Sequence, residues 1–220
     1  MTKLMIATPA QNGLVDIEFC HSFAQTIHSL VTQGISTVVH LKRSGSLIIS
    51  ERNSIMSEFM KSDCSHLLCI DADIAWIPSD VFNLLAKNKE IIGAAYLSKG
   101  DRGFIIRCIN DAMEVSPDGL IEVAAIPMGF VLIHRSAIEK MQAYFPDLYY
   151  KTLDTGEEGY GFFNTMVRNK EFWGEDFSFF LRARDAGLQV WIDPSIELNH
   201  AGKIGKFLDA LLPQKFERIE

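Results

Sequence analysis

The stretch Leu67-Leu68-Cys69-Ile70-Asp71-Ala72-Asp73 decides the fold, because an apolar run ends in two carboxylates separated by one small residue. A short apolar run bounded in this way is typical of a buried strand. In an extended chain residues i and i+2 point to the same side, so the pattern predicts Asp71 and Asp73 on one side of a sheet edge. Two like charges held this close are costly unless a cation lies beside them.

Carboxylate oxygens suit Mg²⁺ or Mn²⁺, and these ions commonly carry the phosphates of a nucleotide. The stretch therefore predicts a metal-diphosphate site at the C-terminal end of a strand. The alternative is a pair of solvated turn aspartates that precede a helix beginning at Pro78.

Strand and helix patterns alternate over the first hundred residues. The expected strands are short apolar runs at 4–7, 36–40, 67–70 and 91–96. The expected helices have apolar residues three and four apart, at 16–34, 50–61 and from 78 onward. Such alternation predicts an α/β fold with a mostly parallel central sheet and helices on both faces.

The second half changes character. Strand patterns occur at 104–108, 120–124, 130–133, 190–192 and 196–198, and helix patterns at 136–143 and 174–187. Residues 144–172 are rich in aromatic residues and glycine and are expected to form a loop. Residues 201–206 are expected to form a flexible basic loop.

Composition limits the classes of function. The chain has 220 residues, 48% of them hydrophobic, which is enough for one sizeable domain with a full core. The net charge of -7 and the lack of a basic stripe argue against nucleic-acid binding. An acidic protein can still bind an anionic nucleotide if a metal ion bridges the two.

The expected environment is the cytoplasm. The four cysteines lack C-x-x-C pairing and are expected to be reduced. The N-terminus lacks a signal-peptide pattern, and no window approaches the ~18 apolar residues of a membrane-spanning helix. The sequence does not indicate an oligomeric state.

Glu175 and Asp176 stand together where a helix is expected to begin. A helix N-terminus stabilises negative charge, so a carboxylate there stays ionised, as a general base must be. The alternative is that one of them only caps the helix. The neighbouring Trp173 offers a flat apolar face that suits a sugar ring, although it could equally belong to the core.

His200 ends a strand-like run, and a neutral imidazole is a good metal ligand. Lys203 and Lys206 follow it and could meet a diphosphate. Arg52, at the start of a predicted helix, could face an anion or be solvated.

Five short motifs occur in one order over nearly the whole chain: Cys69-Ile70-Asp71-Ala72-Asp73, Tyr96-Leu97-Ser98-Lys99, Met128-Gly129-Phe130, Trp173-Gly174-Glu175-Asp176 and His200-Ala201-Gly202. Together they resemble GT-A-fold glycosyltransferases and are similar to small bacterial, phage and large-DNA-virus enzymes of this type. The resemblance implies one GT-A-like, Rossmann-type domain over residues 1–220. Residues 1–100 would form the nucleotide-sugar-binding half, and residues 101–220 the acceptor-binding and catalytic half.

The resemblance also implies roles for single residues. Asp73 would bind Mn²⁺ or Mg²⁺ directly, Asp71 would contact the nucleotide or a metal-bound water, and His200 would be a further ligand. Asp176 would be the catalytic base, with Glu175 beside it. The loop after the first strand, residues 8–12, would hold the nucleobase, with Thr8, Pro9, Ala10 and Asn12 at the donor. The motif residues Ala72 and Lys99 would also contact the donor, and Gly129, Phe130 and Trp173 the acceptor. Arg52, Lys203 and Lys206 are expected at the donor because of their charge.

The expected reaction is metal-dependent transfer of a sugar from a UDP- or GDP-sugar to a glycan or other hydroxyl acceptor, with inversion. Two alternatives stay open. One is a haloacid-dehalogenase-like phosphatase with Asp71 as nucleophile, although Ala75 stands where that family usually has Thr or Val. The other is a non-catalytic module that binds a nucleotide sugar.

Overall fold

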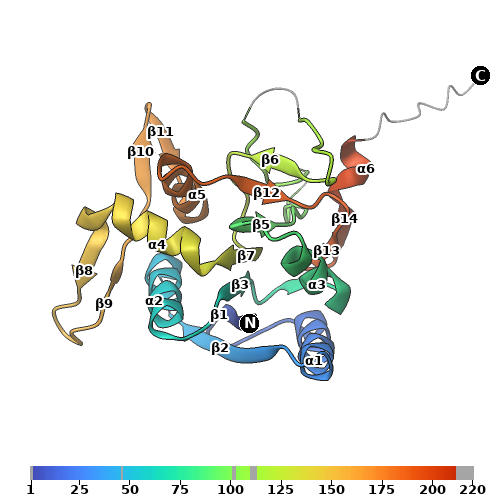
Figure 1. The fold of residues 1–220 in the computed structure, drawn as a ribbon, viewed down its shortest axis with the longest axis horizontal. Helices are drawn as coiled ribbons and strands as arrows, with labels where there is room; N and C mark the ends of the chain where they lie inside the picture. Colours follow the sequence, from blue (N-terminus) through green and yellow to red (C-terminus); the bar gives the residue numbers. More distant parts are fainter. Residues whose placement is uncertain (1, 46, 101–102, 110–112, 212–220) are drawn as a thin grey trace, which may run out of the picture.

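A seven-stranded sheet runs through the molecule in the order β2-β1-β3-β7-β5-β12-β6 (Figure 1). The computed structural model describes residues 2–45, 47–100, 103–109 and 113–211. The strands of this sheet are β1 (Lys3–Gln11), β2 (Ser36–Ser44), β3 (His66–Ile70), β5 (Ile91–Gly93), β6 (Ile121–Val123), β7 (Phe130–His134) and β12 (Val190–Ile192). Only β7 and β6 run against the other five, because both pair antiparallel with their neighbours. The predicted α/β class with a mostly parallel sheet is therefore confirmed.

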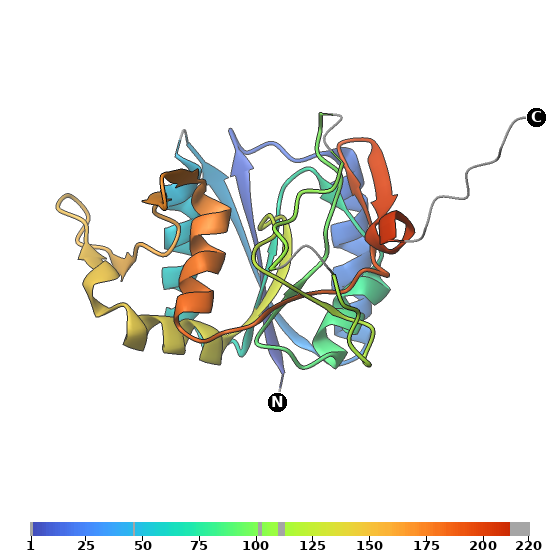
Figure 2. The same ribbon diagram turned by 90° about the horizontal axis from the view of Figure 1, so that it is seen from above.

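Helices cover both faces of the sheet, as Figure 2 shows. One face carries α2 (Ile48–Lys61), α4 (Arg135–Tyr144) and α5 (Glu175–Asp185). The other face carries α1 (Ile17–Thr32) and α3 (Pro78–Ala86). The short helices η1 (Pro146–Leu148) and α6 (Phe207–Leu211) complete the set among the described residues.

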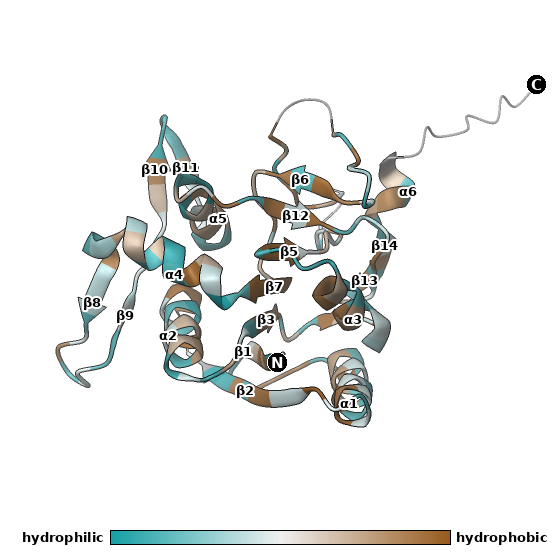
Figure 3. Ribbon diagram, in the orientation of Figure 1, coloured by the Kyte–Doolittle hydropathy of each residue, from teal (hydrophilic) through white to brown (hydrophobic). Residues whose placement is uncertain are grey.

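The alternation within β3 explains why the sheet has two cores. Leu67 and Cys69 belong to the apolar cluster beneath α2, α4 and α5, whereas Leu68 and Ile70 belong to the cluster beneath α1 and α3. Successive side chains of a strand point to opposite faces, so an uninterrupted apolar run suits a strand covered on both sides. The central strands β5 and β7 are correspondingly among the most hydrophobic segments (Figure 3).

The expected loop after residue 7 is in fact strand. β1 continues to Gln11, because β2 is also longer than predicted and pairs with it up to Ser44. β3 stops pairing with β1 at Ala7, so Pro9 lies where only one neighbour remains and a missing N–H is tolerated. The turn itself is confined to the residues around Asn12 and Gly13, which have φ of 56° and 77°.

The predicted loop at 144–172 was also wrong. It contains two hairpins, β8 (Tyr149–Lys151) with β9 (Glu158–Tyr160), and β10 (Met166–Arg168) with β11 (Glu171–Trp173). Asn169 and Lys170 both have positive φ, which matches the twist of a two-residue hairpin turn. The strand expected at 104–108 is reduced to isolated bridges at Phe104 and Arg107.

The expected flexible loop at 201–206 is a hairpin as well. β13 (Glu197–His200) and β14 (Lys203–Lys206) are joined by a turn in which Ala201 and Gly202 have positive φ. β13 also pairs with the two-residue strand β4 (Ile74–Ala75), which follows Asp73 directly. Among the described residues, no helix combines the length and the apolar character needed to cross a membrane.

Candidate active site

Asp71 and Asp73 lie in a tight turn between β3 and β4. The chain leaves the extended conformation after Ile70, and the Ile74 N–H donates a hydrogen bond to the Asp71 carbonyl at 3.2 Å. The expectation that the two aspartates share one side of an extended strand was therefore wrong in its geometry. Both nevertheless border the same two cavities, because the turn projects from the C-terminal end of β3.

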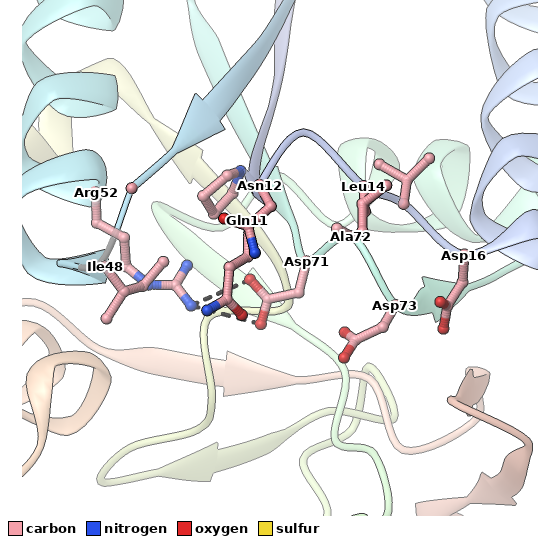
Figure 4. A pocket seen from close by; sticks show the side chains of 12 residues that line it. Gln11, Asn12, Leu14, Asp16, Ile48, Arg52, Asp71, Ala72 and Asp73 are labelled. Atoms are coloured by element: carbon pink, nitrogen blue, oxygen red, sulfur yellow. Dashed lines mark hydrogen bonds and ion pairs between the residues drawn. The ribbon is translucent and has the colours of Figure 1, made fainter.

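One cavity, here called the β1-side cavity, has a volume of about 560 Å³ (Figure 4). Its described lining comes from the ends of β1 and β2, the start of α2 and the aspartate turn: Pro9, Gln11, Asn12, Leu14, Val15, Asp16, Gly45, Ile48, Arg52, Asp71, Ala72 and Asp73. The second, the α5-side cavity, has a volume of about 530 Å³. Its described lining is Asp71, Asp73, Tyr96, Lys99, Ile105, Pro127, Gly174, Glu175, Asp176, Phe177 and His200.

Pairing of β13 with β4 brings His200 to Asp73. His200 lies opposite Ile74, and the Ala201 N–H donates to the Asp73 carbonyl at 3.1 Å. His200 Nε2 then lies 3.7 Å from Asp73 Oδ2. His200 Nδ1 lies 2.7 Å from the Leu97 carbonyl, so it must carry the proton there.

When the His200 imidazole is in its neutral form, Nε2 carries its lone pair and faces the carboxylate oxygen, and a metal ion between these two acceptors would be bound by both. Lys99 supplies one positive group, because its ammonium is ion-paired with the same Asp73 oxygen. Within the described chain no three His, Cys, Asp or Glu side chains are arranged so that they alone could hold a metal ion. Asp73 and His200 can hold Mg²⁺ or Mn²⁺ if substrate phosphates and water complete its shell, as is usual for Mg²⁺.

Asp176 occupies the first turn of α5, where its side chain is 19% exposed. The Met128 N–H donates to Asp176 Oδ2 at 3.0 Å, whereas Oδ1 is fully covered and lies 3.1 Å from Arg52 Nε. Burial raises the pKa of Asp176 to about 6, although the Arg52 charge opposes this shift. Oδ2 is thus the oxygen left to accept a proton from the α5-side cavity.

Arg52 is a buried residue, so the alternative of a solvated helix residue was wrong. Its side chain is 6% exposed, and Nη2 lies 3.1 Å and 3.4 Å from the two Asp71 carboxylate oxygens. Burial favours the neutral form, but the charges of Asp176 and Asp71 outweigh it and raise the pKa of Arg52 above its ordinary value. Figure 4 shows the guanidinium reaching from α2 toward Asp71.

Gly129 provides the space in which these groups meet. A Cβ added there would lie 2.3 Å from the Tyr96 hydroxyl and 2.9 Å from Asp71 Oδ2. Gly129 does not have a positive φ, so the requirement for glycine is steric. Tyr96 is 3% exposed, and its ring packs edge-on against His200 at 4.8 Å between centroids. Tyr96 therefore fixes the orientation of the histidine.

The other residues expected at the site are distributed unevenly. Thr8, Ala10 and Phe130 are buried side chains, and Phe130 packs against Trp76 in the core. Lys203 donates to the Gly100 carbonyl at 3.1 Å. Lys206 pairs in register with Glu197. None of these five is among the described residues that line the two cavities.

Trp173 is half-buried beside the α5-side cavity but is not among its described lining. The Arg107 guanidinium covers one face of its ring at 4.7 Å. The buried Trp173 Nε1 has no hydrogen-bond partner within the part of the chain that the structure describes.

The sequence predicted Asp16 only as a helix cap, placed Gln11 only within the nucleobase loop at 8–12, and gave Tyr96 no role of its own. The Asp16 side chain does not cap α1, and its backbone N–H donates to the Ala72 carbonyl at 2.9 Å. That bond places its carboxylate in the β1-side cavity next to the aspartate turn (Figure 4). Aspartate is a favoured helix cap, so the sequence gave no sign that the Asp16 side chain would leave α1 uncapped. Tyr96 belongs to one of the five motifs, but the sequence does not reveal that its side chain is buried against Gly129.

Comparisons with known proteins show similarity at the level of structure. No family model matches the sequence, and no curated protein is significantly similar to it. A197 from STIV superposes with a TM-score of 0.52 at 18% identity, covering 91% of this chain and 85% of that one. This match shows a shared fold.

Two further solved structures are more distant. A Drosophila β-1,4-galactosyltransferase 7 variant in complex with manganese, UDP-Gal and xylobiose has a TM-score of 0.47 at 16% identity, covering 94% of this chain and 71% of that one. GalNAc-T7 with UDP, GalNAc and Mn²⁺ has a TM-score of 0.45 at 13% identity, covering 91% of this chain and 44% of that one.

Proposed function

We propose that this chain is a metal-dependent glycosyltransferase that moves a sugar from a nucleoside-diphosphate donor to an acceptor hydroxyl. One observation carries the proposal: Asp71 and Asp73 form a wall shared by two cavities of about 560 Å³ and 530 Å³. A donor has the same layout, since its diphosphate joins a nucleoside to a sugar. The diphosphate would lie at the aspartates, with the nucleoside in the β1-side cavity and the sugar in the α5-side cavity.

The proposed donor site is formed by side chains from residues 1–100. The β1-side cavity is bordered by apolar side chains such as Leu14 and Ile48 and by the polar groups of Gln11, Asn12 and Asp16. Apolar walls with a few polar groups suit a nucleoside. Lys99 would turn from Asp73 to the diphosphate. UDP and GDP are both candidate nucleotides.

Asp73 and His200 would hold Mn²⁺ or Mg²⁺, with Asp71 next to them. When bound, the ion would neutralise charge on the diphosphate leaving group.

Asp176 would act as the general base. The acceptor hydroxyl oxygen forms a bond to the anomeric carbon while the bond from that carbon to the diphosphate oxygen breaks. The hydroxyl proton passes to Asp176 Oδ2, and the nucleoside diphosphate leaves with the bonding electrons. A single displacement of this kind inverts the anomeric centre. The raised pKa of Asp176, about 6, is closer to neutral pH than that of an ordinary aspartate, which favours proton transfer.

The phosphatase alternative is disfavoured by one contact. A nucleophilic Asp71 would have to attack phosphorus, yet both of its carboxylate oxygens lie against Arg52 Nη2, at 3.1 Å and 3.4 Å. A carboxylate that binds a buried cation is a weaker nucleophile, because attack would cost part of that interaction.

The test has two stages. Calorimetry with UDP and GDP, each with and without Mn²⁺, should show metal-dependent binding of one of them. Matching nucleotide sugars are then assayed for hydrolysis and for transfer to simple glycans, and the anomeric configuration of the product is read by NMR. Metal-dependent nucleotide binding with no turnover would favour the non-catalytic module. Hydrolysis of a simple phosphomonoester would favour the phosphatase.

A further inference from the structure

The Arg52 guanidinium contacts both Asp71, which the proposed reaction places at the donor diphosphate, and Asp176, which it places at the acceptor hydroxyl. Its Nη2 lies 3.1 Å from Asp71 Oδ1, and its Nε lies 3.1 Å from Asp176 Oδ1. Asp71 follows β3 and Asp176 begins α5, so one side chain from α2 connects three elements. A planar guanidinium carries several donors in fixed directions, which lets it serve two carboxylates at once.

The backbone at the start of β7 connects the same two residues a second time. The Asp71 N–H donates to the Gly129 carbonyl at 3.0 Å. The Met128 N–H donates to Asp176 Oδ2, also at 3.0 Å. Asp71 and Asp176 are therefore connected twice, once through the Arg52 side chain and once through the backbone of residues 128–129.

The contact between Arg52 and Asp176 sets which carboxylate oxygen faces the cavity. Arg52 Nε and Asp176 Oδ1 are both buried, and neither has a well-aligned hydrogen-bond partner among the described residues. Their attraction is therefore mainly between charges, and it holds Oδ1 on the inside. The Met128 N–H leaves Oδ2 with a further lone pair, because a carboxylate oxygen can accept more than one hydrogen bond.

We propose that Arg52 is a positioning residue that acts through Asp176, holding the base in a fixed place relative to Asp71 and hence to the donor diphosphate. The inference rests on the proposed function and gives Arg52 a role other than donor binding. A residue that only bound the donor would keep its guanidinium free for an anion. In this structure both sides of the guanidinium already face carboxylates, and its side chain is 6% exposed.

The experiment compares Arg52→Met and Arg52→Lys, each alone and combined with Asp176→Asn. A misplacement of about 1 Å can cost about 10²-fold in rate, so Arg52→Met should lower kcat by about that factor. The donor Kd from calorimetry should stay near the wild-type value. Arg52→Lys should recover only part of kcat, because one ammonium cannot serve both carboxylates with the guanidinium geometry. In the Asp176→Asn background, Arg52→Met should lower kcat no further.

Arg182→Lys is the matched control. Arg182 is also a buried arginine, 7% exposed, but its Nη1 donates to the carbonyls of Phe162 and Asn164, at 2.7 Å and 2.6 Å. Its substitution should lower the melting temperature and leave kcat per folded molecule unchanged. If Arg52 had a purely structural role, Arg52→Lys and Arg182→Lys would both lower the melting temperature and leave kcat per folded molecule unchanged.

Three results would overturn the proposal in an active wild-type enzyme. They are a raised donor Kd with unchanged kcat in Arg52→Met, a full additional loss of rate from Arg52→Met in the Asp176→Asn background, and an equal fall in kcat from Arg182→Lys. Wild-type protein that binds no nucleoside diphosphate overturns the proposed function itself, and the role of Arg52 with it. That measurement is made first, so the two failures are distinguishable.

Discussion

Replacing Gly129 with alanine should damage catalysis more than stability. The added Cβ would lie 2.3 Å from the Tyr96 hydroxyl, whereas ordinary contacts begin at 3.4 Å, so the two must separate by about 1.1 Å. The same Cβ would lie 2.9 Å from Asp71 Oδ2. Tyr96 is buried and packs against His200, so its displacement would move the histidine as well.

The magnitudes follow from this crowding. Overpacking a buried site costs about 1–3 kcal/mol of stability. A shift of about 1 Å in reacting groups costs about 10²-fold in rate. The assay is transfer rate per folded molecule, with the free energy of unfolding measured by urea denaturation.

Gly159→Ala is the matched control for Gly129→Ala. Its Cβ would lie 2.3 Å from Ser57 Oγ and 2.8 Å from the Tyr150 hydroxyl, a similar crowding in the β8–β9 region. This variant should lose stability and keep its rate. If Gly129→Ala transfers sugar at the wild-type rate per folded molecule, the close approach of Tyr96 and Asp71 is not needed for catalysis and the reasoning fails.

Three further predictions concern the carboxylates. Asp176→Asn should lower the transfer rate by about 10²–10⁴-fold, as is typical for loss of a general base, with donor affinity by calorimetry close to wild type; a retained rate would direct attention to Glu175. Burial raises the pKa of Asp176 to about 6, so the ionised base is present above that pH and the wild-type rate should fall as pH drops through about 6. Burial also raises the pKa of Asp80 to about 6, but the Asp80 carboxylate accepts a hydrogen bond from the Ile77 N–H at the start of α3, away from the two cavities. The Asp80→Asn variant should therefore show the same fall in rate below about pH 6. If that fall disappears in Asp80→Asn, its assignment to Asp176 is refuted. Asp73→Ala should abolish Mn²⁺-dependent binding of the nucleoside diphosphate, and unchanged affinity would count against a metal site at Asp73.

Local sequence determined much of the framework. The apolar run before Asp71 specified β3, and its unbroken hydrophobicity matched a strand covered on both faces. The carboxylates at 175–176 marked the first turn of α5 as expected. These features follow from nearest neighbours along the chain, because the period of apolar residues and helix-start residues act over a few positions.

The hairpins at 166–173 and 197–206 were missed because their turns lack the strongest sequence signals, such as Asn-Gly. Asn169 and Lys170 adopt positive φ without a glycine, and Ala201 does the same beside Gly202. Lysine and alanine rarely take this conformation, and here the strand pairing on both sides of each turn supports it. That pairing is set by contacts that the local pattern does not contain.

Only tertiary structure decided how the candidate site is assembled. The sequence named Asp71, Asp73, Asp176 and His200, but the pairing of β13 with β4 brings His200 within 3.7 Å of Asp73. The packing of α2 against the sheet buries Arg52 between Asp71 and Asp176. The reason is that the contacts of a residue across a sheet or between layers depend on how distant segments pack. Its charge and its preference for helix or strand are, by contrast, properties of the residue and its near neighbours in the chain.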